Sequence, residues 1–166
     1  MSEASTTIVL SPGELSLAVT TAMGRYASKP ASYREDRIAR KSSSFAIYLQ
    51  GVIGEMAFVQ VHGGEMSQEI LSEGDGGKAD VVLPDGRGVE VKTTRYMGSS
   101  PSYMIAGDRA MSKLKEVGHG CLVQILDYDQ AKVFPVYSIA EMNEGWTVRD
   151  YGYGANYVFE PAKHPK

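Results

Sequence analysis

The chain has 166 residues, of which 43% are apolar and 22% are charged, and its net charge at pH 7 is −3. This composition excludes a disordered chain or a coiled coil, and the length predicts one domain. The chain as a whole is not basic, so any binding to nucleic acid must come from a local basic patch. The single cysteine, Cys121, excludes an intramolecular disulfide, a cysteine-rich zinc site and a four-cysteine iron–sulfur cluster.

Targeting and membrane segments are not expected. The first seven residues contain an acid and no Lys or Arg, which disfavours a secretory signal. Residues 42–61 are long enough to span a bilayer, but they carry Glu55, and a charge at the bilayer centre costs at least ~2.5 kcal/mol on insertion scales. We therefore expect a buried helix here, in a cytoplasmic protein with no membrane partner.

The first third of the chain is predicted to be helical. Ser11-Pro12-Gly13-Glu14 has the residues of a capping box and begins a helix that ends at Lys29-Pro30. Ser32-Tyr33-Arg34-Glu35 repeats this signal and begins a second helix. Apolar residues at helical spacing then predict a long or kinked helix from Phe45 to the region of His62-Gly63-Gly64.

The middle of the chain predicts a β-hairpin. Residues 79–83 and 89–94 have the composition and alternation of two antiparallel strands, and residues 84–88 have turn chemistry. One face of this hairpin is apolar and is expected to pack on a core; its members are Val81, Val89 and Val91.

The following segments predict further strands and one helix. A short strand is expected at 103–106, followed by a helix with Asp108 as its cap that ends near Gly118. Residues 121–126 and 132–137 predict a second strand pair, and Pro135 predicts that the later strand is an edge. This order of elements predicts an α/β fold with a central mixed β-sheet flanked by α-helices.

Four ionisable residues in this framework point to metal-dependent chemistry. Glu90 and Lys92 lie two residues apart on one strand and share a face, and the turn brings Asp80 back toward them. Glu55 is the only acid in residues 42–61, where burial requires a partner or a metal. Mg²⁺ prefers oxygen ligands and offsets charge on a phosphodiester, so Asp80, Glu90 and Glu55 are candidate ligands. Lys92 beside the metal would orient or help deprotonate the attacking water, or stabilise developing charge.

A surface hairpin with acids and a lysine on its outer face would show the same local pattern. Glu-x-Lys alone occurs by chance in many strands. The order of a helix carrying Glu55, then Asp80, then Glu90 and Lys92 is what favours a site.

The ordered segments also resemble the PD-(D/E)xK nuclease superfamily. They are Gly54-Glu55-Met56-Ala57-Phe58, Lys78-Ala79-Asp80 and Val89-Glu90-Val91-Lys92-Thr93-Thr94. Glu55 matches the acid of the first core helix, Asp80 the metal-binding aspartate, and Glu90 with Lys92 the (D/E)xK pair. Ala79 stands where the motif name has proline.

This resemblance covers residues 42–95 by motif and implies both a fold and an activity. It implies a restriction-endonuclease-like core in a single nuclease-like domain, residues 1–166, with Mg²⁺ as cofactor and Mn²⁺ as its substitute. Cleavage would leave a 5′-phosphate and a 3′-hydroxyl. Within this domain we expect an N-terminal helix and extension at 1–31, the core at 32–140 and a C-terminal extension at 141–166.

The function that follows is cleavage of DNA by a structure-selective or weakly sequence-specific endonuclease. It would be similar to Holliday-junction resolvases or phage-type enzymes that serve DNA repair or recombination. We expect a homodimer, with a larger nuclease or replication complex as a further partner. The alternatives are a non-catalytic DNA-binding or assembly module with a nuclease-like fold, an exonuclease, or an enzyme that acts on RNA.

Basic residues outside these motifs predict a path for the DNA backbone. On the second predicted helix the arginines recur every three residues and share a face, although a solvated helix face has the same pattern. Lys113 and Lys115 are further candidates along this path. The predicted DNA-contacting residues are Arg34, Arg37, Arg40, Lys41, Lys78 and Arg95.

Overall fold

The computed structural model describes residues 4–28, 44–67, 78–152 and 154–166, and it has the predicted α/β class. Its helices are α1 (Pro12–Ser28), α3 (Ser44–His62), α4 (Gly107–Val117), α5 (Ile139–Asn143) and the 3₁₀ turn η2 (Pro161–Lys163). Its strands are β1 (Thr6–Val9), β2 (Glu65–Met66), β3 (Val81–Val82), β4 (Gly88–Thr94), β5 (Tyr103–Ala106), β6 (His119–Ile125), β7 (Gln130–Val133), β8 (Tyr137–Ser138), β9 (Thr147–Asp150) and β10 (Ala155–Phe159).

The central sheet is mixed. Its strand order is β1-β7-β6-β4-β3-β2, with β8 also paired to β6. β4 and β6 are parallel neighbours, whereas the other pairs are antiparallel. Parallel neighbours need a crossover connection, and the segment with β5 and α4 provides it. The antiparallel pairing of β3 with β4 confirms the predicted hairpin, and β4 lies near the middle of the sheet.

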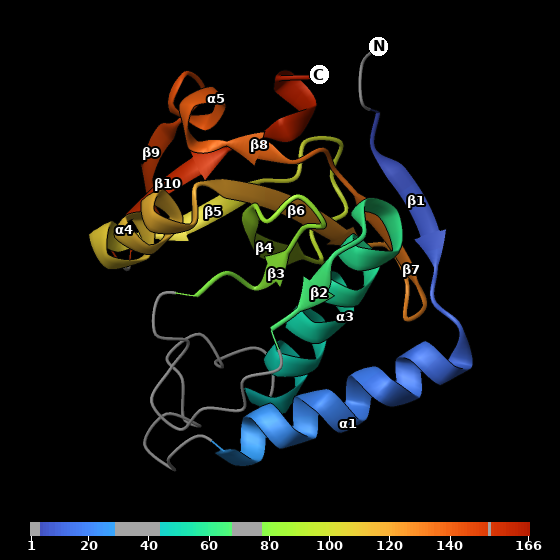
Figure 1. Ribbon diagram of the computed structural model, residues 1–166. Coiled ribbons are helices and arrows are strands. Elements are labelled where there is room, and N and C mark those ends of the chain that lie inside the picture. Colours follow the sequence, from blue (N-terminus) through green and yellow to red (C-terminus); the bar gives the residue numbers. More distant parts are fainter. Residues whose placement is uncertain (1–3, 29–43, 68–77, 153) are drawn as a thin grey trace.

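One face of the sheet is covered by two helices. α3 packs against β4, β6 and β7, and α1 packs against α3 (Figure 1). The predicted capping box at the start of α1 is confirmed, since the Glu14 N–H donates to Ser11 Oγ over 3.1 Å and the Ser11 N–H donates to Glu14 Oε1 over 3.2 Å. The core on this side includes Val81, Val89 and Val91, as the apolar face of the hairpin predicted.

The other face carries α4 and a second sheet of three strands, in the order β5-β10-β9 (Figure 1). A second apolar core joins these elements to β6 and α5. It is built from Tyr103, Ile105, Met111, Leu114, Leu122, Phe134, Tyr137, Met142 and Phe159. The middle of β4 is thus covered on both sides, and its residues Val89, Glu90 and Val91 are buried.

Two predictions from the sequence are wrong. β7 is not an edge strand, because β1 pairs with it on one side and β6 on the other. Pro135 lies beyond the last residue of β7, between β7 and β8, which both pair with β6. Asp108 is not the cap of α4, because the cap position is Ala106. The Asp108 carboxylate instead accepts a hydrogen bond from the Tyr157 hydroxyl over 2.7 Å.

Other predicted elements differ in extent. β3 has two residues, although the Asp80 and Leu83 N–H groups also donate to the β4 side of the hairpin. The second predicted helix, which begins at Ser32-Tyr33-Arg34-Glu35, lies outside the described residues. Within the described ranges, no helix is both long enough and apolar enough to cross a membrane.

α3 and β4 approach closely at Gly54. A Cβ at this position would lie 2.1 Å from Thr93 Oγ1 and 3.2 Å from Thr93 Cβ, so a larger residue would push the helix off the strand. Glu55 is the next residue along α3. The glycine therefore sets how near this carboxylate comes to the sheet.

Two glycines of α3 give a matched test of this approach. Gly54→Ala should lower the free energy of unfolding, since overpacking costs about 1–3 kcal/mol. Gly51→Ala should raise it by about 1 kcal/mol through helix propensity, because a Cβ there meets no atom within 4 Å. Urea denaturation measures both. Equal stabilities of the two variants would show that α3 and β4 are not in close contact at Gly54.

Candidate functional site

The predicted hairpin brings Asp80, Glu90 and Lys92 together. Lys92 Nζ donates to Glu90 Oε1 over 2.5 Å, and Asp80 Oδ2 accepts from the Val91 N–H over 2.8 Å. The backbone bond to Asp80 fixes that carboxylate against the strand that carries the other two residues. Glu90 is only 3% exposed, so this carboxylate lies in the interior and not on the solvated surface of a hairpin.

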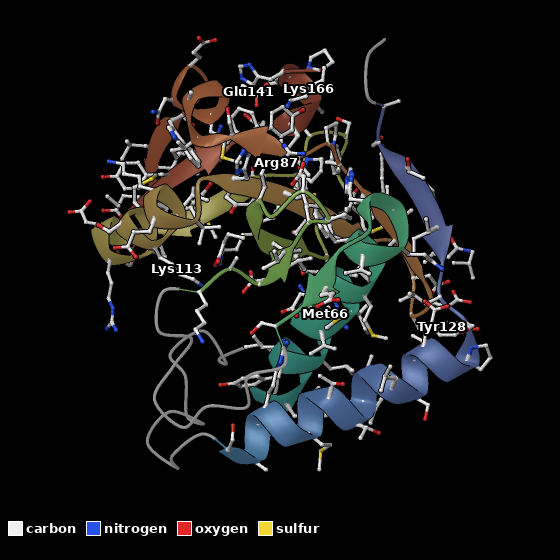
Figure 2. All side chains as sticks on the ribbon, in the orientation of Figure 1. Met66, Arg87, Lys113, Tyr128, Glu141 and Lys166 are labelled. Atoms are coloured by element: carbon white, nitrogen blue, oxygen red, sulfur yellow. The ribbon has the colours of Figure 1, made fainter. Side chains whose placement is uncertain are left out.

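Lys113 of α4 joins the two carboxylates of the hairpin. Its Nζ lies 2.8 Å from Glu90 Oε2 and 3.8 Å from Asp80 Oδ1, so one ammonium is shared by two acids. The contact with Oε2 is an ion pair without hydrogen-bond geometry. Figure 2 labels Lys113 on α4, the helix that contacts β4 from the second layer. The sequence placed Lys113 only as a possible extension of the DNA path, because nothing local shows that α4 packs beside Asp80.

Glu55 is held by a residue that the sequence analysis missed. Arg25, in the last turn of α1, donates to Glu55 Oε1 over 2.8 Å and to Oε2 over 2.9 Å, and it also donates to the Ser67 carbonyl over 2.9 Å. The guanidinium and the carboxylate therefore form a bidentate, charge-assisted pair at a partly buried position. The sequence held one signal that Arg25 is directed inward. Its helical spacing places it on the same face of the helix as Ala18 and Ala22, which are buried.

The three acids are close enough to affect one another. Burial, together with the charges of Glu90 and Glu55, raises the pKa of Asp80 to about 7, whereas Lys113 and Lys92 oppose the change. Burial also raises the pKa of Glu55, against the stabilising contact with Arg25. The local formal charge is balanced by three cations, namely Arg25, Lys92 and Lys113.

A tyrosine supports the strand beneath the acids. Tyr103 is fully buried, and its hydroxyl donates to the Glu90 carbonyl over 3.0 Å. It fits because its neighbour on β6 is a glycine: a Cβ at Gly120 would lie 2.7 Å from Tyr103 Oη. Gly120 is the register partner of Glu90, so the small residue and the supporting hydroxyl occur at the level of the site.

The donor set fits a Mg²⁺ site with two protein ligands. Asp80 and Glu90 already share one cation, and Mg²⁺ is commonly bound through one or two carboxylates, waters and substrate phosphates. Among the described residues, no group of three His, Cys, Asp or Glu side chains is placed to hold a metal. Both Glu55 carboxylate oxygens accept hydrogen bonds from Arg25. The assignment of Glu55 as a third metal ligand stays a prediction.

The predicted DNA-contacting residues are only partly described. Lys78 and Arg95 are exposed, and Arg95 directly follows the strand that carries Glu90 and Lys92. The predictions for Arg34, Arg37, Arg40 and Lys41 lie outside the described residues.

Comparison with known proteins yields no match: no family model, curated protein or solved structure is significantly similar to this chain.

The pair formed by Arg25 and Glu55 should be important for stability. Arg25→Met leaves a buried carboxylate without its cation and should lower the free energy of unfolding by about 3–5 kcal/mol. Adding Glu55→Gln should recover part of this loss, because no buried charge is then left unpaired. Urea denaturation gives each value.

Arg87→Met is the matched control for this prediction. Arg87 pairs with Asp85 over 2.8 Å, but both side chains are about half exposed, so solvent screens the pair and its loss should change the free energy of unfolding little. A loss in Arg25→Met no larger than in Arg87→Met would contradict the buried pairing.

Proposed function

We propose that this chain is a Mg²⁺-dependent phosphodiesterase that cleaves DNA, with Mn²⁺ as an alternative cofactor. The observation that carries the proposal is the pair of carboxylates, Asp80 and Glu90, that share one cation beside Lys92. A restriction-endonuclease-like core is part of the proposal. It is supported by a mixed sheet with α3 on one face and α4 on the other.

The residues have distinct roles in this proposal. Asp80 and Glu90 would hold the metal, which when bound offsets charge on the phosphoryl and leaving oxygens and lowers the pKa of a bound water. Lys92 is 36% exposed on its side chain and can reach from Glu90 toward a phosphodiester. There it would orient the attacking water or stabilise the charge that develops. Glu55, positioned by Arg25, would shape the site from the helix side.

DNA is the proposed substrate and partner. The exposed Lys78 and Arg95 flank the site in sequence, and cations near a phosphodiester site attract a nucleic-acid backbone even in a protein of net charge −3. We propose a structure-selective or weakly sequence-specific endonuclease that acts as a homodimer in the cytoplasm.

A second candidate function is a non-catalytic DNA-binding or assembly module. It is favoured by one observation: Glu55 and Glu90 are already paired with cations, so the negative charges of these carboxylates are balanced without a metal. In that case the six charged side chains would be a structural network between α1, α3, α4 and the sheet. The two candidates differ in whether a divalent cation produces phosphodiester cleavage.

The deciding experiment is a cleavage assay on linear, circular, branched and single-stranded DNA, with Mg²⁺ or with EDTA. The wild-type protein should cut with Mg²⁺ and not with EDTA. Asp80→Asn should cut slower by orders of magnitude, because it removes a ligand charge and keeps the shape. Asp85→Asn, in the exposed turn of the same hairpin, is the control and should retain activity.

Two results would contradict the enzyme assignment. One is the absence of Mg²⁺-dependent cleavage on every DNA substrate and on RNA by folded wild-type protein. The other is wild-type turnover by Asp80→Asn. DNA binding without cleavage would favour the non-catalytic module.

The predicted DNA path has its own test. Lys78→Ala with Arg95→Ala should weaken duplex binding at all sequences. The magnitude of the slope of log K against log salt should fall by about 0.9 for each phosphate that the variant no longer neutralises. Fluorescence anisotropy at several salt concentrations, without divalent metal, measures the slope. Arg87→Ala is the control. An unchanged slope in the double variant would exclude these two residues from the path.

A further inference from the structure

Lys113 has an unusual position for a lysine on a helix surface. Its side chain is 18% exposed, and its Nζ lies between two carboxylates at 2.8 Å and 3.8 Å. Two buried residues of the same helix, Met111 and Leu114, anchor α4 in the second core. The start of the lysine side chain is therefore fixed, whereas its four-carbon stem leaves the ammonium able to move.

The contact partners of Lys113 are the two proposed metal ligands. Two carboxylates that share a site repel each other unless a cation lies between them. Lys113 supplies that cation in the protein alone, because its Nζ lies 2.8 Å from Glu90 Oε2 and 3.8 Å from Asp80 Oδ1. A divalent ion bound by both carboxylates would have to lie between the same two oxygens. An ammonium and a divalent ion cannot both occupy this position.

The charge of the cluster also indicates that Lys113 and a divalent ion exclude each other from this position. With all six groups ionised, the acids Glu55, Asp80 and Glu90 are balanced by the cations Arg25, Lys92 and Lys113, so the cluster has no net formal charge. A divalent cation added to this set would give it an excess of two positive charges. Movement of one ammonium out of the cluster reduces that excess.

We propose that Lys113 is an internal counter-cation that occupies the metal position of the free protein and must leave it when a divalent ion binds. This inference rests on the proposed function for the identity of the site. It has two consequences. Lys113 weakens metal binding by the free protein, and the displaced ammonium becomes available to a phosphate group. Metal and phosphodiester are then bound together better than either alone.

The test compares Lys113→Met with the wild-type protein, without DNA. Methionine keeps much of the length and removes the charge. Isothermal titration with MnCl₂ should give a dissociation constant at least about tenfold lower for Lys113→Met, the scale on which groups around a metal site alter its affinity. In EDTA the variant should melt at a lower temperature than wild type, and Mn²⁺ should raise its melting temperature more.

Matched variants separate this effect from a general loss of positive charge. Lys115→Met removes an exposed lysine of the same helix and should bind Mn²⁺ like wild type. Lys113→Arg keeps the charge and should keep the weak affinity. Adding Asp80→Asn to Lys113→Met should abolish the gain, since the tighter site needs that carboxylate.

The outcomes that overturn the inference are specific. Equal Mn²⁺ affinity in Lys113→Met and wild type overturns it, as does an equal gain in Lys115→Met. If Lys113→Met does not fold in EDTA, refolding on addition of Mn²⁺ supports the inference. Failure of both Lys113→Met and Lys113→Gln to refold with millimolar Mn²⁺ overturns it.

The proposed nuclease activity can fail separately. Tighter Mn²⁺ binding by Lys113→Met, together with no cleavage by wild type on any substrate, would retain the internal counter-cation and reject the enzyme. Cleavage by wild type, together with unchanged Mn²⁺ affinity in Lys113→Met, would retain the enzyme and reject the internal counter-cation.

Discussion

Two carboxylates held close together inside a protein are the constraint on which this structure depends. Asp80 and Glu90 lie on neighbouring parts of one hairpin, where Glu90 is buried and Asp80 is half-buried, and α4 packs against the strand that carries Glu90. Like charges in such a place are unfavourable unless cations are placed beside them. The chain supplies Lys92 from the same strand and Lys113 from the crossover helix, so the crossover that parallel strands require also delivers a counter-charge.

The helices on the opposite face extend the same charge balance. Glu55 comes close to the sheet because α3 has Gly54 at its contact with Thr93, and a buried carboxylate there needs a partner. Arg25 meets this need from α1 and also binds the Ser67 carbonyl next to β2. One guanidinium thus connects the two helices with the edge of the sheet. The same set of contacts serves the stability of the fold and positions the groups proposed for catalysis.

The sequence pattern correctly predicted those helices and strands that depend on residues close to one another in the chain. The capping box of α1, the long apolar α3, the antiparallel pair β3 and β4 and the strand β5 are all confirmed. The errors arose where a distant segment decides. Pro135 favoured an edge strand, but β1, more than a hundred residues away, pairs with β7. Asp108 has the chemistry of a cap, but Tyr157 of β10 binds its carboxylate instead.

The sequence by itself determined the α/β class and the grouping of Asp80, Glu90 and Lys92, because a two-residue strand period and a short turn are enough to bring them together. Only the tertiary structure decided which cations those acids meet. Arg25 lies 30 residues from Glu55, and Lys113 lies 23 residues from Glu90 and 33 from Asp80. Ion pairs over such separations depend on helix packing, and helix packing is set by the apolar faces of whole elements rather than by any local pattern of charge.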